Sequence, residues 1–164
     1  MMPEWLKMIF AAVVGGALAI GGDLLVRWWE REMLRDSLRA GLRGEITALA
    51  ENQGYIHYLE GLLSELKKGV AWEPRDIPVE RSMVIYETNA PTIGLLAPCL
   101  IEKVADFYQM VNRSERNETN LNGGLFHILE DANKTVWLEA YIASERSLNE
   151  KGIKIVQALG EGCK

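Results

Sequence analysis

The sequence has little of the residue chemistry on which small metal proteins and disulfide-stabilised domains depend. Its 164 residues include two cysteines and two histidines. A structural zinc site takes several cysteine or histidine ligands close together in the sequence. A small secreted domain stabilised by disulfides has more cysteines at closer spacing. Because Cys99 and Cys163 lie far apart, we predict that both are free thiols, which is typical of a reducing compartment.

Catalytic signatures are also missing from the sequence. The glycines of GGALAIGG lie in an apolar segment, and the Asn-Gly-Gly at 122–124 lacks the Lys and Ser or Thr of a phosphate-binding loop. His127 precedes Glu130 and Asp131 on one expected helical face, but a metal site needs more ligands. We therefore predict no catalytic residues, no metal site and no cofactor. The chain is expected not to be an enzyme.

Excess positive charge, the mark of a nucleic-acid-binding protein, is missing too. The net charge is −5. The basic and acidic side chains of residues 1–46 cancel, so the whole negative balance falls on residues 47–164. Because an acidic domain repels phosphate, we expect no nucleic acid as a partner.

The amino terminus does contain a long apolar segment. Met8–Gly22 has no charged residue, and Leu24–Val26 extends it. The 23 helical steps from Trp5 to Trp28 cover about 34 Å, close to the roughly 30 Å of a bilayer's hydrocarbon core. Tryptophans at that separation are typical of the two membrane interfaces. Residues 1–29 are therefore predicted to be a transmembrane anchor. The predicted membrane-interface residues are Trp5, Lys7, Arg27, Trp28, Trp29 and Arg31.

Two other interpretations of this segment stay open. Ala17-Leu18-Ala19 fits the cleavage pattern of a signal peptide, which would leave a processed periplasmic helical protein. However, the segment before it has one lysine and a glutamate, and no polar stretch follows Ala19. A buried core helix is the third interpretation.

Arginines predict the orientation of the anchor. Arginines recur every four residues from Arg27 to Arg43, whereas only Lys7 precedes the apolar segment. The positive-inside rule then predicts a single-pass protein of the inner (plasma) membrane with most of the chain in the cytoplasm. Interleaved acids and the 100° turn per residue prevent the arginines from forming one cationic face. Only the first two are expected near lipid headgroups.

Small residues in the anchor predict helix packing inside the membrane. The predicted span contains pairs of small residues four positions apart, which let two helices approach closely. The residues expected to pack are Ala12, Gly15, Gly16 and Ala19. The expected partners are the lipid bilayer and, through these small residues, a second copy of the chain or another membrane protein.

Residues 30–164 carry helical patterns of apolar residues. One stripe comprises Leu34, Leu38, Leu42, Ile46 and Leu49, and a second comprises Ile56, Leu59, Leu62, Leu63 and Leu66. A kink is expected near Gly54, and residues 67–78 form the clearest linker because they contain a glycine and two prolines. A short helix is expected at about 79–86, followed by a loop to Pro98.

Two further helices complete the predicted bundle. The first starts at Pro98 and buries Leu100, Val104, Phe107 and Val111. Residues 112–124 are predicted to be a polar connection. The last helix starts at about Leu125, and its expected buried face comprises Leu129, Ala132, Val136, Ala140, Ala143, Ser147 and Leu148. Only GIKIV, residues 152–156, suggests a strand. The predicted fold is all-α, with an amino-terminal transmembrane helix that continues into an antiparallel helical bundle.

Residues 84–112, VIYETNAPTIGLLAPCLIEKVADFYQMVN, resemble a segment of small bacterial single-span membrane proteins of uncharacterised function. The matching residues are Tyr86, Asn89, Gly94, Leu95, Leu96, Pro98, Val104, Phe107 and Tyr108. The resemblance implies a bacterial inner-membrane protein with a cytoplasmic helical domain, and it implies no catalytic residue. It also implies that Phe107 and Tyr108 are core aromatics.

The functional prediction that follows is a non-enzymatic membrane protein. Its cytoplasmic bundle is expected to act as an interaction or accessory module of a membrane complex. The alternative is a small membrane-active effector, of a toxin or phage-defence type, that oligomerises through its Gly/Ala-rich span.

Overall fold

A computed structural model describes residues 3–71 and 81–162, without the side chains of residues 6–20, 124 and 125. Every regular element within these ranges is a helix. The chain forms two compact units, Met1–Leu38 and Arg39–Lys164, and each is described by itself. The all-α prediction is therefore confirmed for the described residues.

The first unit is part of helix α1, Glu4–Ala50. Within the described residues, no helix meets the length and hydropathy needed to cross a bilayer. Most of the predicted span falls outside that description, because the side chains from 6 to 20 are not part of it. The same holds for the predicted sites Lys7, Ala12, Gly15, Gly16 and Ala19.

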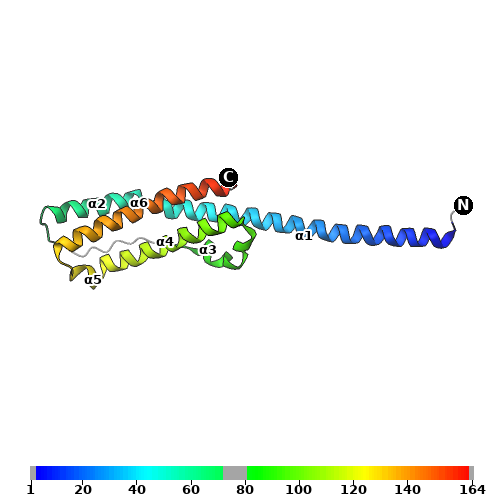
Figure 1. Cartoon of the computed structure of the whole chain (residues 1–164), viewed down its shortest axis with the longest axis horizontal. Coiled ribbons are helices and arrows are strands. Elements are labelled where there is room, and N and C mark those ends of the chain that lie inside the picture. The colour runs from blue at the N-terminus through cyan, green and yellow to red at the C-terminus, as the bar shows by residue number, and fades with distance from the viewer. Residues whose placement is uncertain (1–2, 72–80, 163–164) are drawn as a thin grey trace. The chain divides into compact units, whose positions relative to one another are not determined.

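The second unit is a bundle. Its helices are the end of α1, α2 (Gln53–Lys67), α4 (Pro98–Asn122) and α6 (Asp131–Glu161), and these four pack together. Figure 1 shows the end of α1 and then α2 following each other along α6, with α4 beside them. Helix α6 runs in the opposite direction to α2 and α4 (Figure 1). It is the helix against which both α2 and α4 pack.

Short helices connect these elements. α3 (Val84–Asn89) is followed by the 3-10 helix η1 (Ala90–Leu95), where the sequence predicted a loop. α5 (Gly124–His127) precedes α6, which starts at Asp131 rather than at Leu125.

The break between α1 and α2 lies just before the predicted kink at Gly54. α1 ends at Ala50 and α2 begins at Gln53, with Asn52 at the N-cap position. The side chain of Asn52 is buried and binds across the bundle, so tertiary contacts rather than the glycine determine where the chain bends.

The predicted polar connection at 112–124 is wrong for residues 112–122. Residues 112–122 continue α4, because Ser114 and Leu121 are buried on the same side as the expected apolar face. That face is itself confirmed: Leu100, Val104, Phe107 and Val111 are all fully buried.

The predicted buried face of α6 is also wrong. Val136 is 66% exposed, and Ala132, Ala140 and Ala143 also face solvent. The buried face comprises Leu138, Tyr141, Ile142, Glu145, Leu148, Gly152, Ile155 and Leu159. Only Leu148 belongs to both sets. The segment GIKIV lies within α6 and is not a strand.

The stripes on α1 and α2 are largely confirmed. Leu38, Leu42, Ile46 and Leu49 are buried, whereas Leu34 is exposed in the first unit. On α2 the buried residues are Ile56, Leu59, Leu62 and Leu66, with Leu63 packed against them.

The free-thiol prediction for Cys99 is wrong. Cys99, in the first turn of α4, forms a disulfide. Cys163 lies outside the described residues. The prediction of a reducing compartment rested on free thiols, so the disulfide at Cys99 removes its basis.

Candidate functional site: a buried polar layer

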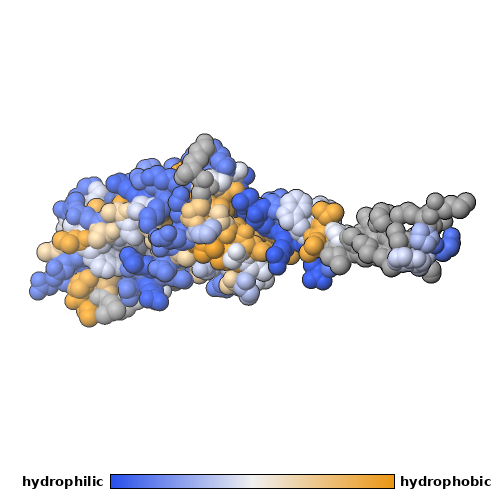
Figure 2. All heavy atoms as spheres, turned by 45° about the vertical axis from the view of Figure 1, so that its right-hand side comes forward, coloured by the Kyte–Doolittle hydropathy of each residue, from blue (hydrophilic) through white to orange (hydrophobic). Residues whose placement is uncertain are grey.

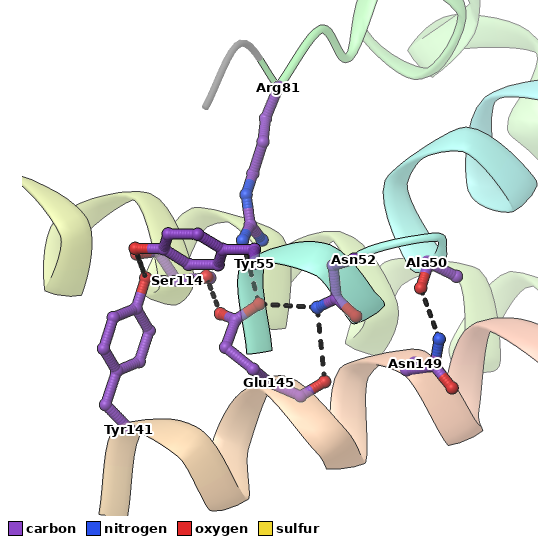
Figure 3. A network of polar contacts seen from close by, with 8 residues as sticks. All are labelled: Ala50, Asn52, Tyr55, Arg81, Ser114, Tyr141, Glu145 and Asn149. Carbon is purple, nitrogen blue, oxygen red and sulfur yellow. Dashed lines mark hydrogen bonds and ion pairs between the residues drawn. The ribbon is translucent and has the colours of Figure 1, made fainter. Parts of the chain in front are cut away.

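The most unusual residue of the bundle interior is a glutamate. Glu145 of α6 is 0% exposed, in the middle of the buried face of its helix. A buried carboxylate is costly unless its oxygens accept hydrogen bonds or pair with a cation. Figure 3 shows that groups from three other parts of the chain point at this side chain.

Both carboxylate oxygens of Glu145 have partners. Asn52, between α1 and α2, donates from Nδ2 to Oε2 at 2.6 Å. Arg81, which precedes α3, donates from Nη2 to the same oxygen at 2.9 Å, and its side chain is only 4% exposed. The hydroxyl of Ser114 on α4 donates to Oε1. Glu145 therefore links α6 to the α1–α2 junction, to the segment before α3 and to α4 through charge-assisted hydrogen bonds.

Two tyrosines extend the network. Tyr141, one turn before Glu145, donates to the backbone oxygen of Ser114 at 3.2 Å. Its hydroxyl lies 3.1 Å from that of Tyr55 on α2. Burial raises the pKa of both tyrosines above the usual value. The guanidinium of Arg81 lies 5.9 Å from the ring centre of Tyr55, within cation–π range.

These residues form a polar layer across an otherwise apolar core. The layer takes Asn52 from the α1–α2 junction, Ser114 from α4 and Glu145 from α6. In each case, buried apolar side chains precede and follow the polar residue along the chain. The flanking residues are, in chain order, Leu49 and Ile56, Val111 and Leu121, and Ile142 and Leu148. A helix that slid by one turn would place Glu145 among apolar groups. The layer therefore favours this register over one shifted by a turn.

Two polar atoms in the layer lack a hydrogen-bond partner within the described structure: Nη1 of Arg81 and Oδ1 of Asn52. The layer is thus charge-balanced but not fully satisfied. Its carboxylate, guanidinium and hydroxyls are buried from solvent and already bound to one another. Chemically, the arrangement can hold helices together, and it offers no exposed nucleophile or base.

A second carboxylate, Glu45 on α1, organises the start of α3. It accepts hydrogen bonds from the backbone amides of Ile85 at 2.7 Å and Tyr86 at 3.0 Å, and from the hydroxyl of Tyr108. The rings of Tyr86 and Tyr108 stack with centres 3.9 Å apart. Burial and the bond to Glu45 raise the pKa of Tyr108 above the usual value. Phe107 and Tyr108 are core aromatics, as expected.

A surface groove lies where the α1–α2 junction meets α6. It has a volume of about 580 Å³ and runs between the α1–α2 junction, at Ala50 and Gly54, and α6, at Ile153 and Val156. Its lining is mostly apolar, and Ile153 is half-exposed.

The predicted membrane-interface residues belong to the other unit. Trp5, Arg27, Trp28, Trp29 and Arg31 are all exposed on α1. Asp23 and Arg27 form an ion pair at 2.9 Å. In the part of the chain that the structure describes, no group of His, Cys, Asp or Glu side chains is arranged to hold a metal ion.

The polar layer was missed at the sequence level because its members are far apart. Asn52, Arg81 and Ser114 precede Glu145 by 93, 64 and 31 residues. The available signal was the position of Glu145 itself. It stands at helical spacing from Leu138, Tyr141, Leu148 and Gly152, where an apolar residue is expected.

Comparison with known proteins gives no family: no protein-family model matches the chain, and neither curated proteins nor solved structures give a significant match.

Proposed function

We propose that this chain is a single-span membrane protein whose helical bundle serves as an interaction or accessory module of a membrane complex. The observation that carries the proposal is a collar of exposed apolar side chains on α1. The collar comprises Leu24, Leu25, Val26, Trp28, Trp29, Met33 and Leu34. All of them are more than half exposed. Figure 2 shows hydrophobic residues at the surface of this part of α1.

The collar covers a wide arc of the helix rather than its whole circumference. At 100° per residue, six of its seven side chains fall within about 200°, and the remaining side carries Asp23, Arg27, Glu30 and Arg31 together with Leu34. Leu24, Leu25 and Val26 are consecutive, so they point in directions about 100° apart. An apolar arc of that width is broader than the stripe by which a surface helix packs on one neighbour. Each such side chain contributes roughly 1.5–3 kcal/mol when it is fully buried. A lipid bilayer covers an arc of this width, which a single packing helix does not.

The charges in the collar fit a membrane interface. Asp23 and Arg27 form an ion pair, which lowers the cost of placing either beside hydrocarbon. Arg31 follows one turn later and can reach anionic headgroups. The preceding charge-free segment Met8–Gly22 supplies the remaining length of the proposed span.

The bundle supports an interaction role through its rigidity. The layer around Glu145 determines one arrangement of the helices, and a single arrangement presents a constant surface to a partner. Small residues at Ala12, Gly15, Gly16 and Ala19 would provide contacts inside the bilayer. The resemblance of residues 84–112 to bacterial single-span proteins supports the same proposal.

Two features bear on orientation and favour opposite sides of the membrane. The arginines after the span favour a cytoplasmic bundle by the positive-inside rule. The disulfide at Cys99 is typical of an oxidising compartment. We propose the cytoplasmic orientation, because the positive charges act during insertion, whereas a disulfide forms afterwards and depends on the redox conditions.

Association within the membrane tests the proposed role. The full-length protein is cross-linked in native membranes, solubilised in detergent and captured by an affinity tag. We expect one partner, a second copy or another membrane protein, at fixed stoichiometry. Gly16→Leu should abolish its recovery, while the matched control Val14→Leu should not. Recovery of an uncross-linked monomer from native membranes would contradict the role.

A further inference from the structure

The segment Arg81–Leu95, here called the strap, lies on the bundle without a core of its own. It comprises the residues before α3, then α3 and η1. Neither α3 nor η1 contains a buried residue. Segments with few buried apolar contacts open at lower free energy than the helices that carry the core. Something other than apolar burial must therefore hold the strap in place.

Two carboxylates hold the strap in place. One binds Arg81, where the strap begins, and the other binds the first turn of α3. Glu145 of α6 binds the guanidinium of Arg81 at 2.9 Å. Glu45 of α1 binds the amides of Ile85 and Tyr86, the first turn of α3. These contacts fix the strap to two different helices of the bundle. Both contacts are charge-assisted, and these are stronger than neutral hydrogen bonds.

Packing around the second carboxylate is shallow. Tyr86 stacks on Tyr108, and the side chain of Ile85 covers Gly41 of α1, where an added Cβ would lie 3.0 Å from its Cγ2. Both strap residues remain only half-buried. Immediately after the strap, Leu96 is buried in the core and marks where firm attachment begins.

We propose that the strap is a conformational device: it detaches from the bundle as a unit when either carboxylate contact is lost, while α4 and α6 stay folded. Detachment uncovers Glu145 and Glu45, which present acceptor oxygens to any group that can replace Arg81 or the α3 amides. All of these contacts lie within the bundle and none involves the proposed membrane span.

Hydrogen exchange of the full-length protein in detergent micelles tests the device. In the wild type, amides of Ile85 to Leu95 should exchange at least roughly tenfold faster than those of α4 and α6. Glu45→Gln keeps the shape of the side chain and removes its charge. It should speed exchange across the strap by a further roughly tenfold to a hundredfold, with α6 unchanged.

Trypsin provides a second readout at the other contact. Arg81 is nearly inaccessible when it is bound to Glu145, so the Arg81–Ser82 bond should resist cleavage in the wild type. Glu145→Gln should make this bond susceptible while α6 amides keep their protection. The matched control is Glu60→Gln, which removes an exposed partner of Arg146 and should leave the bond resistant.

The outcomes separate the proposal from simple destabilisation. Strap amides as slow to exchange as those of α6 would overturn it. So would a Glu45→Gln variant in which the strap and α6 accelerate together, because the strap would then open only with the whole bundle. If Glu145→Gln unfolds the bundle, the Glu45→Gln result alone decides.

Discussion

The guanidinium of Arg81 lies 2.9 Å from Oε2 of Glu145, and the two side chains are 4% and 0% exposed. Such a pair gains little net stability over apolar residues of the same volume, because both charges lose their hydration. Breaking it is costly, because one charge is left buried without its partner. The effects of substitutions at this pair are therefore strongly non-additive.

Arg81→Met should lower the free energy of unfolding by up to about 3–5 kcal/mol, because it removes the cation that pairs with Glu145. Detachment of the strap, which lets water reach that carboxylate, limits the loss. Adding Glu145→Gln to that variant should recover more than half of the loss. Urea denaturation followed by circular dichroism provides the measurement. The matched control is Arg146→Met, which breaks an exposed pair between Arg146 of α6 and Glu60 of α2 and should leave the unfolding midpoint nearly unchanged. Equal effects of the two arginine substitutions would contradict the account.

Gly152→Ala should destabilise the bundle by roughly 1–3 kcal/mol through overpacking. An added Cβ would lie 2.5 Å from Cβ of Ala50 and 3.0 Å from Cε2 of Phe107, at the point where α6 crosses α1 and α4. Gly61→Ala is the control, because Gly61 on α2 has open space around it. That change should stabilise the helix by up to about 1 kcal/mol. Thermal unfolding of both variants distinguishes packing from helix propensity.

How far sequence reasoning succeeds here depends on how uniform each buried face is. The face of α4 from Leu100 to Val111 was predicted because every buried position holds an apolar residue. On α6 the buried stripe contains Glu145 and Gly152, while Val136 faces solvent, so the apolar pattern predicted the wrong face. Tertiary contacts with distant residues determine that orientation. The local stripe of Leu138, Tyr141 and Leu148 does lie on the buried side, but Glu145 and Gly152 interrupt it.

Stability should fall as pH rises above about 10, the usual pKa of tyrosine. The pKa values of Tyr55, Tyr108 and Tyr141 are raised in the folded protein, chiefly by burial. In this range the unfolded chain loses tyrosine protons that the folded protein keeps, so deprotonation favours unfolding. Tyrosinate absorbance should show these three groups titrating together with loss of helix. Full ionisation of all five tyrosines with the helices intact would contradict this prediction.

The redox state of Cys99 in living cells should follow the orientation of the bundle. With a cytoplasmic bundle, Cys99 should be reduced in cells and form its disulfide after exposure to an oxidant. Acid quenching followed by alkylation with a high-mass maleimide shows the state by gel mobility. A Cys99 thiol already protected from alkylation before lysis would contradict the cytoplasmic orientation and indicate the opposite one.

The central claim is that α1 anchors the chain in a bilayer. Extraction of native membranes with alkaline carbonate tests it most directly, because this treatment releases peripheral proteins and leaves spanning ones. We predict that the full-length protein stays in the membrane pellet. Gly16→Leu should stay there too, while Gly16→Lys, which places a charge costing roughly 2.5–3.5 kcal/mol within the proposed span, should reduce the retained fraction. Recovery of the wild-type chain in the supernatant would contradict the account.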